Sequence, residues 1–379
     1  MRDSTKPNII YISPSIIPSR SANSIHVINQ ANAFANLGHK TFLFCASEHI
    51  TLSKNHIEDF YGIKINDNLS FIVCSKDHKS GLNMRIGIFS IYYLIRKKIL
   101  CKPFKILSRN LYFSFLFSFS KYSHIYETHG PEKGFRFFMQ KLILSKEANH
   151  IIVISSALKN ILSNIFNVSK SKFVVLHDAA NEYIKSGHTK LKYNGKNLIK
   201  VGYFGHLYEG RGIEIVIGLS NVFKNIDFYI VGGEPEMVKK LKEQNCKMDN
   251  VFILGHQKNS YARHLMNEMD VLLMPYQNKV SIGTKDSDTS KWMSPLKMFE
   301  YMSSNSAIIS SELDVIKEVL KNKYNALLAA PNSLDDWEES LNLLINDDAL
   351  RKDLSKNAYK DFKDKYTWHS RANNILSIN

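Results

Sequence analysis

The sequence predicts an α/β protein of two Rossmann-like domains, each built on a doubly wound parallel sheet. Short apolar runs suited to buried parallel strands, such as residues 8–13 and 227–233, alternate with helical stretches along the chain. A length of 379 residues is enough for two separate cores. The apolar periodicity stops beyond residue 178 and resumes at residue 198, which predicts a junction there.

The expected domain organisation follows from that junction. We place an N-terminal Rossmann-like domain at residues 1–180 and a linker at 181–198. A second Rossmann-like domain follows at 199–364, and the chain ends in a helical segment at 365–379.

Composition narrows the choice of partners. The formal net charge is +15, which suggests a polyanionic partner such as a phosphorylated substrate or anionic lipid. The lysines are spread along the whole chain without a nucleic-acid-binding motif, so we expect no nucleic acid partner. An AT-rich genome would enrich lysine without any functional reason, and that alternative stays open.

The compartment is predicted from cysteines and apolar runs. The four cysteines, Cys45, Cys74, Cys101 and Cys246, are far apart in sequence and form no C-x-x-C pair. That spacing is typical of a reducing compartment and argues against a structural metal. The N-terminus shows no secretory signal and the most apolar segments are too short to span a bilayer. We therefore expect a cytoplasmic protein, peripheral on a membrane at most.

The first domain opens as a β-loop-α-β unit. A strand at residues 8–13 is followed by a polar loop, a helix at about 25–37 that ends at Gly38, and a strand at 41–46. There is no G-x-G-x-x-G, which argues against an NAD-dependent oxidoreductase. Small residues in the loop, Ser21, Ala22 and Asn23, permit close approach of a ligand.

Residues 83–122 mix aromatic and aliphatic side chains with many lysines and arginines. A basic, aromatic-rich amphipathic region can lie on an anionic membrane surface. Alternatively, its apolar residues are core helices of the first domain and its lysines are solvated. Both interpretations stay open at this point.

The most informative stretch is residues 291–305, KWMSPLKMFEYMSSN. We expect Ser294 to be the N-cap of a helix and Pro295 its first residue, so that the free N–H groups around Leu296 can bind an anion. Glu300 lies further along the same helix, where its carboxylate can accept both hydroxyls of a ribose. Residues 270–275 and 306–311 read as strands on either side, which puts the start of this helix at the carboxyl edge of a sheet, where such folds bind ligands.

A second phosphate-binding candidate is the turn GHLYEGRG, residues 205–212. It lies between a strand and a helix, where backbone amides and the guanidinium of Arg211 can converge on phosphate. Such a turn is unspecific alone, but some ninety residues later comes the SP-x-K-x-FE helix start. The two together indicate a nucleotide site.

The runs DVLLMPY, SPLKMFEYMSSNSAIISS, ELDVIKEVL and NALLAAP resemble the donor half of retaining glycosyltransferases of the GT-B fold, glycosyltransferase family four. The resemblance implies two Rossmann-like domains facing each other across a cleft, with the last helix, anchored by Trp368, packing back on the first domain. It implies that Glu300 holds the nucleotide ribose. The sequence departs from the family at Trp292, where a second glutamate is usual.

The resemblance also implies roles for the remaining site residues. His129, at the end of the strand HIYET, is expected near the donor sugar, with Glu127 as its structural neighbour. Arg211 takes the position of the family's phosphate-binding lysine, and Gly205 and His206 begin the same turn. His256 is expected beside the nucleobase, and the loop of Ser21, Ala22 and Asn23 near the phosphates and the acceptor. The side chain of Lys297 can add charge to the phosphate site or point to solvent.

The function implied is transfer of a sugar from a UDP- or GDP-sugar to an acceptor hydroxyl with retention of configuration, without metal or other cofactor. The expected acceptor is a glycan or lipid-linked saccharide of the bacterial cell envelope, such as capsule or lipopolysaccharide. Two alternatives stay open: a nucleotide-sugar hydrolase or epimerase of the same fold, and a non-catalytic nucleotide-sugar-binding subunit.

Overall fold

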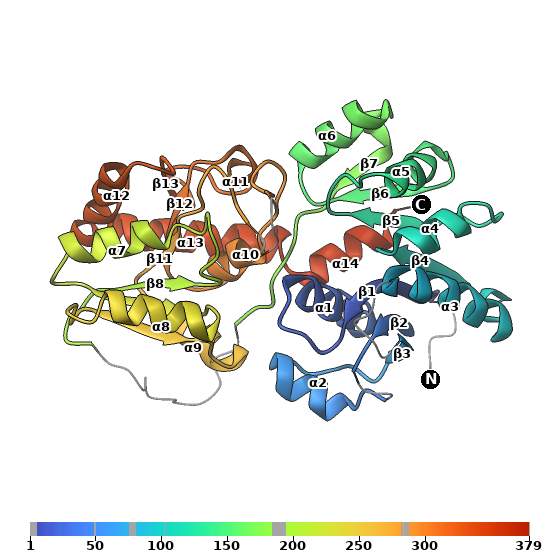
Figure 1. Cartoon of the computed structure of the whole chain (residues 1–379), viewed down its shortest axis with the longest axis horizontal. Coiled ribbons are helices and arrows are strands. Elements are labelled where there is room, and N and C mark those ends of the chain that lie inside the picture. The colour runs from blue at the N-terminus through green and yellow to red at the C-terminus, as the bar shows by residue number, and fades with distance from the viewer. Residues whose placement is uncertain are drawn as a thin grey trace. The chain divides into compact units, whose positions relative to one another are not determined.

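The computed structural model describes residues 6–48, 51–75, 81–101, 103–183, 195–281, 283 and 288–378. The chain divides into two compact units (Figure 1). The first comprises Met1–Asp178 and Trp368–Asn379, and the second comprises Ala179–Thr367. Most of the predicted linker, residues 184–194, lies outside the described residues.

The first unit contains a seven-stranded sheet in the order β3-β2-β1-β4-β5-β6-β7, and every pairing in it is parallel. Its strands are short and mostly buried, as the apolar runs predicted: β1 (Asn8–Ile16), β2 (Thr41–Ala46), β3 (Leu69–Ser75), β4 (Phe104–Ser108), β5 (Ile125–Thr128), β6 (His150–Val153) and β7 (Phe173–Val175). The strand order reverses direction between β1 and β4, so the carboxyl ends of these strands form a crevice edge typical of ligand sites.

The helices of the first unit are α1 (Ala22–Asn36), α2 (Lys54–Tyr61), α3 (Leu82–Arg96), α4 (Leu111–Phe117), α5 (Phe135–Ser145), α6 (Ser156–Phe166) and α14 (Trp368–Leu376). One hydrophobic cluster joins α3 and α4 to strands β1, β2 and β4. The last helix, α14, packs beside the first helix, α1 (Figure 1).

The first helix begins three residues earlier than the sequence predicted. Ser21 is its N-cap, because its side-chain oxygen accepts a hydrogen bond from the Ser24 N–H at 3.2 Å. Ala22 and Asn23 form the first turn, so these three residues are the start of α1 rather than a loop. The predicted end is confirmed, since Gly38 follows the C-cap Leu37 with a left-handed φ of 87°.

The second unit contains a six-stranded parallel sheet in the order β10-β9-β8-β11-β12-β13. Its strands are β8 (Lys200–Phe204), β9 (Asp227–Val231), β10 (Val251–Gly255), β11 (Val271–Met274), β12 (Ala307–Ser311) and β13 (Leu327–Ala329). Here the order reverses between β8 and β11. The prediction of two Rossmann-like doubly wound domains is confirmed.

The helices of the second unit are α7 (Ile213–Val222), α8 (Pro235–Gln244), α9 (Asn259–Asn267), α10 (Leu296–Met302), α11 (Asp314–Lys317), α12 (Leu334–Asn346) and α13 (Asp348–Lys365). The apolar faces of α7, α8, α12 and α13 form one core with the strands of the sheet. Trp337 is fully buried there, and its indole N–H donates to the Ala330 carbonyl at 3.0 Å, which satisfies its one polar group.

The predicted cap of α10 is wrong by one residue. Pro295 is the N-cap and Leu296 is the first helical residue, so Ser294 precedes the helix instead of capping it. No side chain caps this end. With seven residues, α10 is short, and side-chain charges rather than its backbone dipole must supply most of any anion site here.

Candidate functional site

The candidate site of the second unit lies where β8 and β11 end. Three glycines of the turn after β8 have a left-handed backbone, and two of them, Gly205 and Gly212, pack against α10 and the residue that follows β11. Gly205 has a φ of 150°, and a Cβ added there would lie 2.6 Å from the Lys297 ammonium nitrogen. Gly212 has a φ of 71°, and a Cβ there would collide with the Pro275 carbonyl oxygen. Both glycines are therefore required for the turn to pack against α10 and the end of β11.

Arg211 is held in place by two hydrogen bonds. Its Nη1 donates to the Tyr276 hydroxyl at 3.1 Å, and its Nη2 donates to the Ser281 carbonyl at 2.9 Å. Its Nε is buried without a hydrogen-bond partner. Among the described residues no carboxylate forms an ion pair with this guanidinium. It is a fixed cation with donor capacity to spare, which suits a bound anion.

Lys297 adds a second cation close by. Its ammonium lies 4.1 Å from the centre of the Tyr203 ring and 5.4 Å from that of Tyr276. Burial, with the nearby charge of Arg211, holds the pKa of Lys297 well below its usual value. The prediction that this side chain can point to solvent is wrong: the ammonium lies over an aromatic ring beside Gly205.

Glu300 follows Lys297 by three residues on α10, so the two side chains share one face of the helix. Burial raises the pKa of Glu300, while the charges of Arg263 and Lys297 act in the opposite direction. Arg263, from α9, also donates to the Glu300 carbonyl at 3.3 Å and to the Ser303 hydroxyl at 2.8 Å. These contacts fix the C-terminal half of α10.

Tyr301 fixes α10 to the sheet. Its buried hydroxyl accepts a hydrogen bond from the Phe204 N–H at 2.9 Å and lies 3.3 Å from the Leu273 carbonyl, so it joins the helix to the ends of β8 and β11. The face that carries Lys297 and Glu300 is thereby held at the carboxyl edge of the sheet. A site on such rigid elements loses little entropy on binding.

Two of the three predicted site histidines, His206 and His256, lie just after β8 and β10. The carbonyl of His206 accepts from the Tyr203 hydroxyl at 2.5 Å, and its ring stacks on Tyr208 with centroids 4.7 Å apart. Burial, with the charge of Arg211, lowers the pKa of His206, so its ring is neutral near pH 7. His256 directly follows β10 and is exposed.

A second cluster, in the first unit, surrounds His129. Its Nε2 lies 3.0 Å from Oε1 of Glu127, the buried carboxylate at the end of β5. Oε1 also lies 3.2 Å from His26 Nε2 and 3.0 Å from Arg371 Nη2. His26, from α1, bonds the Asp178 carboxylate through Nδ1 at 2.7 Å. The cluster thus consists of Glu127, His129, His26, Asp178 and Arg371.

The charges of this cluster are coupled. Burial alone would raise the pKa of Glu127, but the charges of Arg371, His26 and Arg109 outweigh it and hold the pKa well below its usual value. Burial lowers the pKa of His129 to about 4, with Arg109 acting in the same direction. Near neutral pH the carboxylate of Glu127 is therefore ionised and the ring of His129 is neutral.

The donor atoms of His26, Glu127 and His129 lie within 4.8 Å of one another, a spacing that could hold a metal ion. The guanidinium of Arg371 lies 3.0 Å from the same Glu127 oxygen, so the charge that would attract a metal is already paired.

Sequence reasoning missed three members of the cluster, His26, Asp178 and Arg371. Arg371 left a signal: it falls on the same helical face as Trp368, Ala372 and Ile375, which are all buried, and it is itself only 2% exposed. An arginine on the apolar face of a helix indicates a buried partner. Its partner, Glu127, could not be identified without the fold.

The structure thus has two doubly wound units, and in the second of them two cations and a carboxylate lie at the carboxyl edge of the sheet, where such folds bind ligands. Residues 191–361 match the family model described as glycosyl transferases group 1. An uncharacterized glycosyltransferase of Methanocaldococcus jannaschii is 25% identical over 301 residues, which cover 72% of this chain and 74% of that protein. The N,N'-diacetylbacillosaminyl-diphospho-undecaprenol alpha-1,3-N-acetylgalactosaminyltransferase of Campylobacter jejuni is 23% identical over 228 residues, 59% of this chain and 56% of that protein.

Solved structures share the whole fold. Sucrose-phosphate synthase of Thermosynechococcus elongatus superposes with a TM-score of 0.73 at 15% identity, covering 98% of each chain. HepE of Anabaena, solved in complex with UDP, superposes with a TM-score of 0.69 at 13% identity, covering 97% of this chain and 98% of that one. Residues 191–361 thus resemble the glycosyl transferases group 1 domain, and the chain as a whole has the fold of these solved glycosyltransferase structures.

Proposed function

We propose that this glycosyltransferase moves a sugar from a UDP- or GDP-sugar to an acceptor hydroxyl with retention of the anomeric configuration. The observation that carries the proposal is the pair of cations, Arg211 and Lys297, beside Glu300 at the carboxyl edge of the second sheet. Among the described residues neither cation forms an ion pair, and the pKa of Lys297 is lowered by burial. A diphosphate would supply the missing negative charge, and the Glu300 carboxylate would accept the ribose hydroxyls.

The same two cations also suit the step in which the nucleoside diphosphate leaves the sugar. When the bond between the anomeric carbon and the diphosphate oxygen breaks, negative charge develops on the diphosphate. Two fixed cations there stabilise that charge without reorganising, and the reaction then needs no metal at this position. In a front-face path the departing phosphate takes the proton of the acceptor hydroxyl, whose oxygen bonds to the anomeric carbon from the side that the phosphate leaves.

Two comparisons support the choice of substrates. HepE of Anabaena has been solved with UDP and with UDP-glucose, which favours a UDP-sugar as donor. The Campylobacter relative is named for an undecaprenol-linked acceptor, and the structure of WaaG, a glycosyltransferase involved in lipopolysaccharide biosynthesis, superposes with a TM-score of 0.64. These names favour a lipid-linked saccharide of the bacterial cell envelope as acceptor.

Thermal unfolding of the whole chain tests the donor class. We expect UDP or GDP, or one of their sugar conjugates, to raise the melting temperature, since a ligand that binds only the folded state stabilises it. The shift should persist in EDTA and shrink in Lys297→Met. NAD and CMP serve as controls. A panel in which NAD alone stabilises the chain, or in which EDTA abolishes the shift, would contradict the proposal.

Location at a membrane is a further part of the proposal. Among the described residues, no helix is long and apolar enough to cross a bilayer. We define the apolar–basic surface as a set of exposed side chains of α3 and α5 and of the residues that follow α3 and α4. It consists of the apolar residues Ile88, Tyr92, Ile95, Phe119, Phe135 and Phe138 and the cations Arg96, Lys97, Lys98, Lys121 and Lys141.

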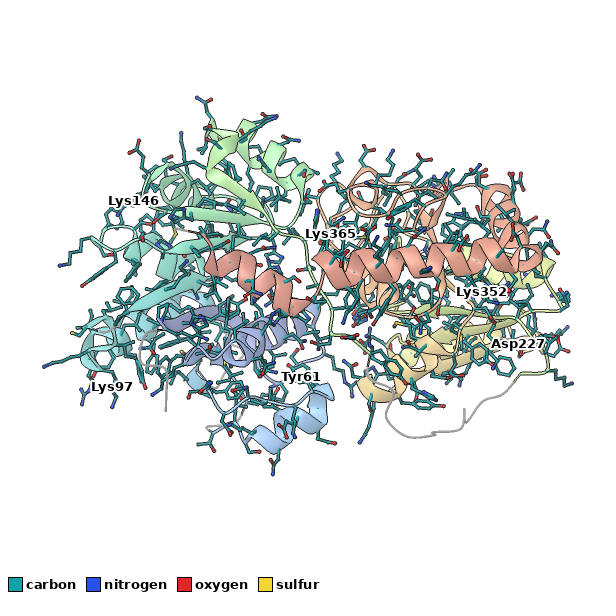
Figure 2. All side chains as sticks on the ribbon, turned by 180° about the vertical axis from the view of Figure 1, so that it is seen from behind. Tyr61, Lys97, Lys146, Asp227, Lys352 and Lys365 are labelled. Carbon is teal, nitrogen blue, oxygen red and sulfur yellow. The ribbon has the colours of Figure 1, made fainter. Side chains whose placement is uncertain are left out.

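Helix α3 of this surface has two apolar faces. On α3, Ile86 and Leu94 are buried in the core, while Ile88, Tyr92 and Ile95 are exposed. Residues 83–122 therefore contribute core helices, as one of the two interpretations predicted, and they also leave apolar side chains uncovered. The membrane interpretation stays a prediction. Figure 2 shows Lys97 on the surface near the end of α3. Exposed aromatics flanked by cations suit the interface of an anionic bilayer, which we propose as the occupant.

Flotation with vesicles tests this part. We expect the chain to bind phosphatidylserine-containing vesicles and to lose about fivefold in affinity for each lysine removed in Lys97→Ala/Lys98→Ala, since a cation near such a surface contributes about 1 kcal/mol. Lys239→Ala/Lys240→Ala, which removes two exposed cations of α8, is the matched control. Equal binding to neutral vesicles, or equal losses in the two double variants, would contradict this surface as the docking site.

A further inference from the structure

Arg371 is a buried cation, and each of its three guanidinium nitrogens donates a hydrogen bond to the chain around it. Its Nη1 donates to the Gln30 side-chain oxygen at 2.7 Å, its Nε donates to the His177 carbonyl at 2.9 Å, and its Nη2 lies 3.0 Å from Glu127 Oε1. The guanidinium is planar, so contacts on three sides leave it a single orientation. Arg371 therefore fixes the position of the Glu127 oxygen.

That oxygen determines which nitrogen of His129 carries a proton. An ionised carboxylate only accepts hydrogen bonds, and His129 Nε2 lies 3.0 Å from Glu127 Oε1. A neutral His129 must then carry its hydrogen on Nε2, which leaves Nδ1 as an acceptor. The side chain of His129 is 32% exposed, so its ring is accessible from outside the cluster.

Both places where the chain passes between the two units are tied to this cluster. The chain leaves the first unit after Asp178 and re-enters it at Trp368. Asp178 bonds His26 at 2.7 Å, and the ring of Trp368 meets the ring of His26 edge-on with centroids 4.9 Å apart. Arg371 lies one helical turn beyond Trp368. The residues around Glu127 are thus in contact with both points where the chain passes between the units, Asp178 and Trp368.

We propose that Arg371 is a positioning residue for His129: through the Glu127 carboxylate it holds the imidazole as the Nε2–H tautomer, with Nδ1 as a hydrogen-bond acceptor. A hydroxyl group, such as that of a sugar, is the ligand class that this nitrogen would take. The link to sugar transfer rests on the proposed function, whereas the tautomer does not.

The test uses the full chain labelled with ¹⁵N-histidine and long-range ¹H–¹⁵N correlation spectra at pH 7. The signals of His129 are assigned by their loss in His129→Gln. In the wild type we expect a protonated Nε2 and an unprotonated Nδ1. Arg371→Met should move both nitrogen signals toward a tautomer mixture, and Arg371→Lys, which keeps a cation, should restore them in part. Arg136→Met removes an arginine from a surface ion pair of the same unit and should leave them unchanged.

Kinetics give a second readout, with UDP-glucose as the probe and UDP release as the signal. Arg371→Met should lower kcat roughly tenfold with little change in KM, as expected when a supporting contact of a site residue is lost. Wild-type His129 with Nδ1 protonated, or unchanged His129 signals in Arg371→Met, would overturn the proposal whether or not UDP-glucose is a donor. If Arg371→Met does not fold, Arg371→Lys is compared with the wild type in its place: a lysine cannot make all the contacts of the planar guanidinium, and His129 signals identical to those of the wild type would overturn the proposal.

Discussion

Replacing Arg211 by alanine is expected to lower turnover by about 10²–10³-fold, the effect of losing one fixed donor at a developing charge. The guanidinium is held by Tyr276 and Ser281, and its Nε has no partner, so it is in place before a ligand arrives. Removing it leaves Lys297 as the remaining cation beside the diphosphate. The measurement is the rate of nucleoside diphosphate release from the donor that the thermal panel identifies.

The matched control for this prediction is Lys239→Ala, which removes an exposed cation from α8 of the same unit and should leave turnover unchanged. Folding is checked by the melting temperature, because loss of the Tyr276 contact alone should cost only about 1 kcal/mol. Wild-type turnover in Arg211→Ala would remove this residue from the mechanism. A loss confined to KM would mean that Arg211 binds the ground state and the transition state equally.

Glu300→Ala is expected to lower the affinity for uridine, or guanosine if GDP is the ligand, by about 10- to 100-fold through loss of hydrogen bonds to a carboxylate. The nucleoside reports the loss of the ribose contact more directly than the nucleoside diphosphate does. Removing a carboxylate three residues from Lys297 makes the site more positive, which strengthens the attraction for diphosphate and masks part of the loss. Titration calorimetry with both ligands separates the two effects.

Lys297→Met is expected to affect the two ligands in the opposite order. It should weaken binding of the nucleoside diphosphate and leave the nucleoside nearly unaffected, because its ammonium lies over Tyr203 on the side of the glycine turn. Equal losses for both ligands in both variants would mean general damage to α10 rather than separate ribose and phosphate contacts. Unchanged nucleoside binding in Glu300→Ala would exclude the ribose role.

The fold was predictable because each strand leaves its pattern within a few consecutive residues. Apolar runs such as residues 8–13 and 227–233 became β1 and β9, since a strand buried on both faces must be apolar throughout. The errors were in the bounds of elements: β1 runs three residues beyond the predicted end, to Ile16, and two helix starts were misplaced. Ser21 precedes a helix that the apolar spacing placed at Ile25, and Pro295 rather than Ser294 caps α10. Several residues near the start of each helix could be its N-cap, and the packing of the backbone decides which of them is.

The sequence by itself determined the two doubly wound units, the group 1 resemblance and the candidates Glu300, Arg211 and His129. Only the tertiary structure decided what those side chains meet. It put Lys297 over Tyr203, 94 positions away in the chain, and Arg371 against Glu127, 244 positions away. Periodicity and capping act over a few residues, whereas ion pairs and cation–π contacts depend on distances in space that only the packed sheets and helices set.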